Sequence, residues 1–323
     1  MTAGRLSVTA VAAGALAAPA FVDEPGLRTL AAVCMFATLA SAWNILGGYA
    51  GYASFGNVVF FGLGAYAVAV LMARAGWAFW PALPVAVTLG AAFAALVGLP
   101  VLRLRGHYFA IATLGVAEAT REAVLNLPRL TGGGAGITVP VLGSRATTPY
   151  PGNTAFYYLF LAALAVALGT VFALTRSRTG YALRAIAEDE PGAAATGVHT
   201  TRVKVGAFAL SGALTALAGA LFALQQVTIY PERLFSVEIT VLMVVMAVIG
   251  GAGTILGPVA GAAALQLTAE YLRQHYLNLH LVVFGAVIVA VVVFAPQGAV
   301  TLLRDAWTQR RLGLLDAVRR YRV

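Results

Sequence analysis

Apolar runs about as long as a bilayer is thick follow one another along most of the chain. They occupy residues 27–46, 57–73, 82–102, 154–175 and 205–224. A helix of about 20 apolar residues spans a bilayer, and charged residues make up only 10% of this chain, against about a quarter in soluble domains. We therefore predict an all-α polytopic membrane protein with about ten transmembrane or half-membrane helices, some of them broken by glycine.

Two further apolar runs lie near the ends of the chain. Residues 6–22 form either an uncleaved first span, which we prefer, or a signal peptide with a cleavage site at Ala18-Pro19-Ala20. Residues 281–295 form the last predicted span. Residues 1–302 then make up one transmembrane domain, and the basic tail, 303–323, is predicted to lie on the membrane surface as an amphipathic helix.

The basic residues are distributed unequally between the loops. The net charge is +9, and most Arg and Lys residues fall at positions 5, 103–105, 176–204 and 304–322. By the positive-inside rule these segments are cytoplasmic, so both termini are cytoplasmic and the number of spans is even. Membrane topology thus accounts for the charge and argues against a nucleic-acid partner. The single cysteine, Cys34, lies in an apolar run, so the chain forms no intrachain disulfide.

Residues 176–204 form the only long polar stretch between apolar runs that would face the cytoplasm. The first part is rich in helix-forming residues, with Leu183 and Ile186 three apart on one face and Arg184 off that face. We predict that the stretch folds into two short helices, which form a rigid projection for a partner protein. The alternative is an ordinary solvated connector.

The second predicted helix of this stretch has recognisable end signals. Asp189 or Glu190 can cap its first turn, and Pro191 falls where a missing N–H does no harm. Gly197 suits the left-handed conformation that ends many helices. The position of the projection therefore depends on the turn at Gly197.

Two glycine-rich segments interrupt the apolar pattern. Residues 47–56, GGYAGYASFG, follow one run, and residues 250–257 follow a run of about half a span, 239–249. Irregular backbone at membrane depth must be buried in protein or line a cavity, and paired broken segments indicate a transport site. By our span count the two run parallel, so they do not demonstrate a simple inverted repeat. The candidate path residues here are Asn44, Gly48, Gly51, Ser54, Asn57, Gly250, Gly251 and Gly253.

Small residues recur at helical spacing in two places. One face of the run 205–224 carries Gly212, Ala216, Gly219 and Ala223, and a later segment carries Gly253, Gly257 and Gly261. Both patterns predict helices that pack closely against a neighbour.

Residues 107–127 are predicted to span the membrane although they carry Glu118, Arg121 and Glu122. The spacing places the three on one helical face, where Arg121 can pair with either carboxylate. Charged groups at such depth normally face a bundle interior or a cavity. Glu118 and Arg121 are therefore either a polar part of a substrate path or an internal ion pair that fixes helix packing. In a secondary transporter or channel they would relay protons or ions.

The longest outer loop, residues 128–154, contains the run TGGGAG at 131–136. No lysine follows the run and the loop faces outside, which argues against nucleotide binding. The loop is either a docking surface for an external partner or a plain flexible connection. The 4 histidines lie in different loops, and no Walker motif or cluster of nucleophile, base or metal ligands occurs. We predict no enzymatic activity, cofactor or metal for this chain.

Several sequence blocks occur in a characteristic order. They are NILGGYAGYASFGN at 44–57, LRGHYFAIATL at 104–114 with Glu118 and Arg121, TGGGAGI at 131–137, residues 180–197, VIGGAGTILG at 248–257 and APQG at 295–298. Each block alone is weak, because glycine-rich membrane segments are common. Together, over nearly the whole chain, they resemble the M-type permease subunits of bacterial ABC importers for branched-chain amino acids.

The resemblance implies a permease that works by alternating access, with ATP hydrolysis carried out by partner subunits. It implies a heterodimer with a sister permease, two cytoplasmic ABC ATPase subunits and a periplasmic substrate-binding protein, in a bacterial inner membrane. The implied substrate is a branched-chain or other neutral amino acid, with urea or short amides as the alternative.

The same resemblance implies that the polar loop 176–204 docks on the ATPase. Residues 188–197 are similar to the EAA-type coupling segment of the family, although Pro191 and Gly192 stand where the family favours helix formers. The residues implied for coupling are Tyr181, Arg184, Glu188, Asp189, Glu190, Ala194 and Gly197.

Overall fold

The computed structural model describes residues 14–141, 148–275 and 285. The predicted last span, 281–295, lies outside the described residues apart from position 285, and the predicted tail, 303–323, lies outside them entirely. Of the predicted first run, 6–22, the described part begins at residue 14 and contains the short 3-10 helix η1 (Ala18–Ala20).

Six helical segments of the described chain are long and apolar enough to cross a membrane. They are α2 (Glu24–Ala50), α3 (Val58–Ala75), α4 (Phe79–Val101), α7 (Asn153–Arg176), α10 (Thr200–Gln226) and the segment Pro231–Gly250, which contains α11 (Pro231–Leu234) and α12 (Val237–Gly250). The prediction of a polytopic, helical membrane protein is therefore confirmed.

The other described elements are shorter or more polar. They are the long helices α5 (Gly106–Leu125) and α13 (Gly257–His275) and the short elements α6 (Pro128–Thr131), η2 (Gly133–Ala135), β1 (Ile137–Thr138), α8 (Arg178–Glu188), α9 (Glu190–Ala195) and β2 (Thr228–Ile229). Helix α5, predicted to be a span, is not among the six, because Glu118, Arg121 and Glu122 fall within its 20 residues.

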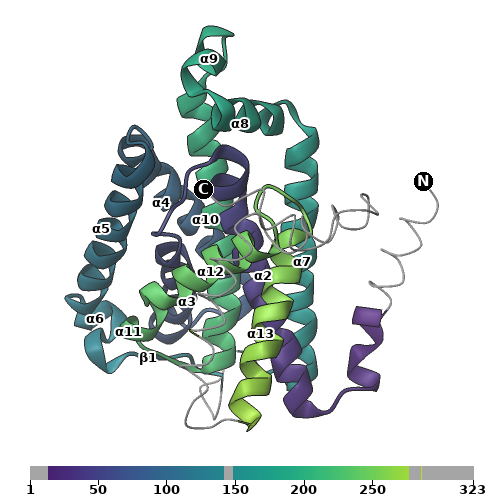
Figure 1. The fold of residues 1–323 in the computed structure, drawn as a ribbon. Helices are drawn as coiled ribbons and strands as arrows, with labels where there is room; N and C mark the ends of the chain where they lie inside the picture. Colours follow the sequence, from purple (N-terminus) through teal and green to yellow (C-terminus); the bar gives the residue numbers. More distant parts are fainter. Residues whose placement is uncertain (1–13, 142–147, 276–284, 286–323) are drawn as a thin grey trace, which may run out of the picture.

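Helix α10 packs against α2, α3 and α4 in the middle of the bundle (Figure 1). Small residues allow its backbone to touch theirs, because a methyl group added at Gly64 of α3 would overlap the carbonyl of Ala216. One added at Gly212 would lie 2.8 Å from the carbonyl oxygen of Gly90 in α4. The close contact predicted from the small-residue face of α10 is confirmed.

The two ends of the bundle carry different elements (Figure 1). Helices α8 and α9 project beyond one end, which we call the α9 end. Helix α6, β1 and α11 lie at the opposite end, which we call the β1 end. There β1 pairs antiparallel with β2, with Ile137 opposite Ile229. The described part of loop 128–154 is thus a folded cap, in which the Thr131 hydroxyl donates to the Val124 carbonyl at 2.7 Å.

The break after α2 begins later than predicted. Residues 47–50 remain helical, and α2 ends where Gly51 adopts a left-handed φ of 73°. Glycine is tolerated in this last turn because protein surrounds it: the indole of Trp43 lies against Gly47, and Tyr49 and Ala50 are buried. The irregular backbone is therefore confined to the residues between Gly51 and α3.

Candidate functional site

One buried asparagine fastens the tip of the α12–α13 hairpin to α2. The side chain of Asn44 is fully buried; its Nδ2 donates to the carbonyl of Thr254 at 2.8 Å, and its Oδ1 accepts from the backbone N–H of Gly253 at 2.8 Å. A single amide thus satisfies one donor and one acceptor of the irregular loop. The two glycine-broken segments are brought together, although Asn44 and Thr254 are 210 residues apart in sequence.

Glycine makes the approach of the hairpin to α2 sterically feasible. A methyl group added at Gly48, one turn after Asn44, would lie 2.5 Å from the backbone nitrogen of Gly253. The loop itself turns through Gly251, with a φ of 112°, and Gly253, with a φ of 74°. Both values favour glycine over residues with a side chain.

The two helices of the hairpin also touch backbone to backbone. A methyl group added at Gly250 would overlap the carbonyl of Gly257, and one added at Gly261 would overlap the carbonyl of Met246. The close packing predicted from the spacing of Gly257 and Gly261 is confirmed, and it leaves no room at this tip for larger residues.

Much of the chain between α2 and α3 is buried although it has no regular structure; Gly51 and Ala53 are the exposed residues of this connection. The indole Nε1 of Trp43 donates to the Ser54 carbonyl at 2.8 Å, and the Nδ2 of Asn57 donates to the Ser211 hydroxyl of α10 at 2.9 Å. Ser54 and Asn57 are both buried. The prediction that irregular backbone here is enclosed by protein is confirmed for these residues.

Helix α8 follows the predicted pattern. The Ser177 hydroxyl caps it by accepting from the Gly180 N–H at 3.2 Å, and Leu183 and Ile186 are buried against the bundle. Arg184 is exposed, as is Tyr181 at 64%. The exposed face of α8 therefore points away from the bundle at the α9 end.

Helix α9 is capped by Asp189, whose Oδ2 accepts from the Gly192 N–H at 3.1 Å, so of the two predicted caps the structure selects Asp189. Pro191 fits in the first turn, and Gly197 turns the chain with a φ of 91°. A methyl group at Gly197 would meet nothing within 4 Å among the described residues, so backbone conformation alone makes this position suit glycine.

The other residues implied for coupling are exposed, but the carboxylate of Glu190 points into the protein. Its Oε1 lies 2.7 Å from the Nζ of Lys204, and its Oε2 lies 3.2 Å from the Nε of Arg105 and accepts from the Tyr52 hydroxyl at 2.5 Å. Burial raises the pKa of Glu190, but the hydrogen bonds from Lys204 and Tyr52 and the charges of Lys204 and Arg105 outweigh burial and lower the pKa. The carboxylate is therefore ionised at neutral pH.

Lys204 and Tyr52 were missed by sequence reasoning. Lys204 was counted only as one of the basic residues that mark the cytoplasmic side, yet it is 3% exposed. The available signal was its position between Val203 and Val205 at the start of an apolar run, where a charged side chain requires a partner.

Charged residues of α5 lie on its outer face. The guanidinium of Arg121 pairs with Glu118 and, at 2.9 Å, with Glu122, as the spacing predicted. The side chain of Glu118 is 58% exposed and that of Glu122 is 51% exposed. All three residues belong to one helix, so the pair joins no two described helices, and Arg121 is half-buried between the two exposed carboxylates.

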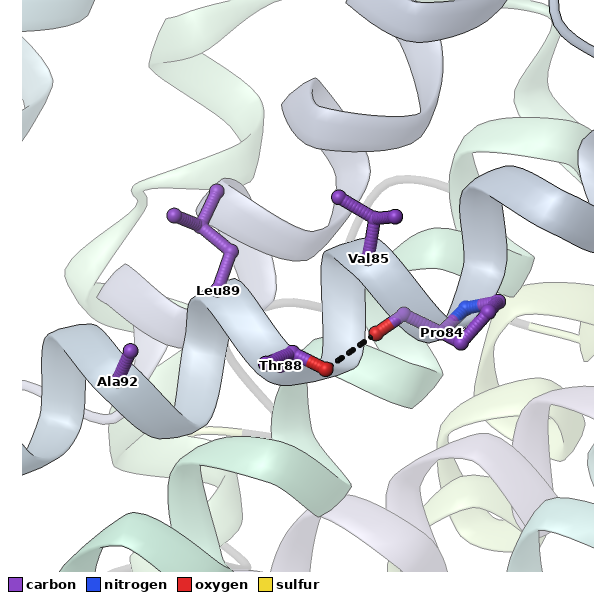
Figure 2. A pocket seen from close by; sticks show the side chains of 5 residues that line it. All are labelled: Pro84, Val85, Thr88, Leu89 and Ala92. Carbon is purple, nitrogen blue, oxygen red and sulfur yellow. Dashed lines mark hydrogen bonds between the residues drawn. The ribbon is translucent and has the colours of Figure 1, made fainter.

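A hollow of about 450 Å³ lies on the outer face of α4 (Figure 2). It is lined by Pro84, Val85, Thr88, Leu89 and Ala92. The Thr88 hydroxyl donates to the Pro84 carbonyl at 2.7 Å, and the other lining side chains are apolar. The hollow therefore lacks the charged groups that would bind the ammonium and carboxylate of an amino acid.

The structure divides the predicted path residues into separate places. Asn44, Gly48, Gly250, Gly251 and Gly253 lie together at the hairpin tip. Ser54 and Asn57 lie in the buried connection to α3, and Gly51 lies at the end of α2, where an added methyl group would be 3.9 Å from Ala187 of α8. Glu118 and Arg121 lie on the outer face of α5.

Comparisons with known proteins agree with this architecture. A family model described as the permease component of the branched-chain amino acid transport system matches residues 27–292. The high-affinity branched-chain amino acid transport system permease protein LivM of Salmonella typhimurium is 31% identical, over 93% of this chain and 76% of its own length. The Escherichia coli protein of the same name is 30% identical over the same shares. No solved structure gives a significant match.

The family match covers five of the six apolar segments completely, the sixth, α2, from its fourth residue, and the whole hairpin that Asn44 holds. The similarity to the two bacterial permeases extends over most of both chains. The chain therefore belongs to the family of permease components of branched-chain amino acid transport systems.

Proposed function

We propose that this chain is one half of the membrane pore of an ATP-driven importer for branched-chain or other neutral amino acids. It would pair with a sister permease, two cytoplasmic ATPase subunits and a periplasmic binding protein in a bacterial inner membrane. Family membership is the observation that carries this proposal. The relatives' names specify branched-chain amino acids, and extending that substrate to this chain is part of the proposal.

The α9 end would face the cytoplasm, with both termini on that side and about ten spans or half-spans in all. The positive-inside rule supports this orientation, because Arg176, Arg178, Arg184 and Arg202 lie in α8 or in the helix ends that flank α8 and α9. Arg105, with Arg103 two residues before it, pairs with Glu190 of α9. Helices α8 and α9 project there, where they would dock on an ATPase subunit through Tyr181, Arg184, Glu188, Asp189, Ala194 and the turn at Gly197. The folded cap at the β1 end would then face the binding protein.

The translocation path would pass along the hairpin tip held by Asn44. Helix α12 has only 14 residues and ends at a glycine loop, and interrupted helices of this kind are typical of transport sites. The outer face of α5 would line the same path opposite the sister permease. Glu118 supports this placement, because exposed charges at membrane depth are costly in lipid and are normally found against protein or water.

Reconstitution tests the proposal. The chain, co-expressed with its neighbouring permease, ATPase and binding-protein genes, should drive uptake of leucine, isoleucine or valine into proteoliposomes only when ATP and the binding protein are present. Uptake by the purified chain alone would instead indicate a secondary transporter or channel. If the binding protein binds urea or short amides instead, the proposed substrate is wrong, but the proposed ATP-driven mechanism is unaffected.

Replacement of Gly197 with valine should abolish ATPase association while membrane insertion stays normal. A β-branched residue is strained at a φ of 91°, by about 1 to 3 kcal/mol, so α9 would lose its position. Co-purification of the ATPase with the permease measures the effect. Gly206→Val is the matched control, since Gly206 lies in α10, where a methyl group would meet nothing within 4 Å of described residues. Normal co-purification of the Gly197→Val variant would show that docking occurs elsewhere.

Replacement of Glu118 with glutamine should lower transport without changing the melting temperature. The carboxylate is exposed, and Arg121 keeps Glu122 as a partner, so folding loses little. A path residue, by contrast, affects uptake when its charge is removed. If the Glu118→Gln variant shows the same uptake as the unmodified complex at equal ATP hydrolysis, the outer face of α5 does not line the translocation path.

A further inference from the structure

A closed hydrogen-bond network joins four separate parts of the chain at the α9 end. Its centre is the ammonium of Lys204, a residue in the first turns of α10. Lys204 is only 3% exposed. The Nζ lies 2.7 Å from Glu190 Oε1 and donates to the Leu102 carbonyl at 2.8 Å and to the Tyr52 hydroxyl at 2.9 Å. An ammonium has three N–H donors, so all three are used.

Each acceptor of this network comes from a different element. Glu190 is the first residue of α9, which belongs to the projecting loop. Tyr52 lies in the irregular connection between α2 and α3, and its hydroxyl donates in turn to Glu190 Oε2 at 2.5 Å. The Leu102 carbonyl lies just past the last turn of α4, where carbonyls lack helical partners and favour a cation. The network is thus fully satisfied and links α9, α10, α4 and the irregular connection.

The connection held by Tyr52 leads to the membrane interior. The Tyr52 ring packs edge-on against Phe109 of α5, with ring centroids 5.3 Å apart. Three residues further on, the backbone N–H of Phe55, which lies outside any helix, donates to the Thr113 hydroxyl of α5 at 3.0 Å. Movement of Tyr52 would therefore displace α5 and the end of α2, the helix that carries Asn44.

A buried ion pair of this kind is not needed for stability. Buried charges cost desolvation energy that their attraction often only offsets, and an apolar pair of similar volume commonly does as well. Networks in which every donor and acceptor is used, however, hold one geometry strongly. The placement of this one, between the projecting loop and the irregular connection, favours a positional role.

We propose that Glu190, Lys204 and Tyr52 form the joint through which displacement of α9 reaches the irregular connection and α5. The three are positioning residues, since they act through the segments they hold and touch no substrate. This inference rests on the proposed function, because it assumes that an ATPase moves the α8–α9 loop. It predicts that breaking the joint separates ATP hydrolysis from transport.

The test uses the complete transporter, with uptake and ATP hydrolysis measured in the same proteoliposomes. Glu190→Gln alone would leave Lys204 charged and unpaired, so the main variant is the double substitution E190Q/K204M, which removes both charges together. We expect ATP hydrolysis to persist while uptake per ATP falls about tenfold. Tyr52→Phe, which keeps the ring on Phe109 and loses both hydroxyl hydrogen bonds, should lower the same ratio by a smaller factor.

Glu270→Gln is the matched control, because it breaks the ion pair between Glu270 and Arg273 on α13, which the joint does not include. Its ratio of uptake to hydrolysis should equal that of the unmodified complex. An unchanged ratio in both E190Q/K204M and Tyr52→Phe would overturn the inference. A parallel loss of uptake, hydrolysis and yield in Tyr52→Phe would overturn it as well, since that result indicates a purely structural role. Absence of ATP-driven uptake in the unmodified complex would instead overturn the proposed function.

Discussion

Substitution of Gly250 by valine should prevent the α12–α13 hairpin from closing. Even the first carbon of the new side chain would overlap the carbonyl of Gly257 and lie 2.9 Å from the backbone nitrogen of Gly261. These are backbone atoms of the facing helix, so no side-chain rotation relieves the clash, and the cost is about 3 kcal/mol or more. We expect a large drop in melting temperature and loss of transport.

Thermal unfolding of the detergent-purified variant measures this effect. Gly169→Ala in α7 is the control, because a methyl group there would meet nothing within 4 Å of described residues. Alanine is the better helix former by about 0.5 to 1 kcal/mol, so the control should be neutral or slightly stabilising. If the Gly250→Val variant has the same melting temperature as the unmodified protein, helices α12 and α13 are not in contact at this position.

Substitution of Asn44 by leucine should free the hairpin tip from α2. Leucine has a similar volume but no polar atoms, so the N–H of Gly253 and the carbonyl of Thr254 both lose their partner. At about 1 to 2 kcal/mol for each lost hydrogen bond, the destabilisation is about 2 to 4 kcal/mol. Because the tip is the proposed path, transport should be lost even at temperatures where the protein remains folded.

Uptake measured well below the melting temperature separates these two effects. Ser41→Ala, one turn earlier in α2, is the matched control: Ser41 is 1% exposed, and its hydroxyl has no hydrogen-bond partner among the described residues. Loss of that hydroxyl should change little or stabilise. Normal uptake by the Asn44→Leu variant would show that the hairpin tip does not need to be held by α2 for transport.

Local features of the fold were predictable from the sequence because they depend on neighbouring residues. The apolar runs predicted the membrane helices, Asp189 was one of two predicted caps of α9, and Gly197 was predicted to be left-handed. The small-residue faces of α10 and α13 likewise predicted close helix contacts. Each of these follows from helix geometry within a few turns of chain.

Features that depend on distant residues were not predictable in the same way. Nothing in the sequence around Asn44 indicates that its amide binds a loop 210 residues away, and Lys204 carries no local sign that Glu190 faces it. The outward orientation of Glu118 was also missed, because helical spacing shows which residues share a face but not which way the face points. These three cases depend on how the helices assemble.

The contact of α10 with its neighbours limits which parts of the protein can move. Carbonyl groups of Ala216 and Phe61 lie where side chains of α3 and α10 would otherwise begin, so the three helices α3, α4 and α10 have almost no space between them to slide or tilt. Packed interiors shift between discrete arrangements rather than deforming gradually. During a transport cycle, α3, α4 and α10 would accordingly move together as one rigid body. Opening and closing would then require movement of the surrounding elements: the α12–α13 hairpin, α5, α8 and α9.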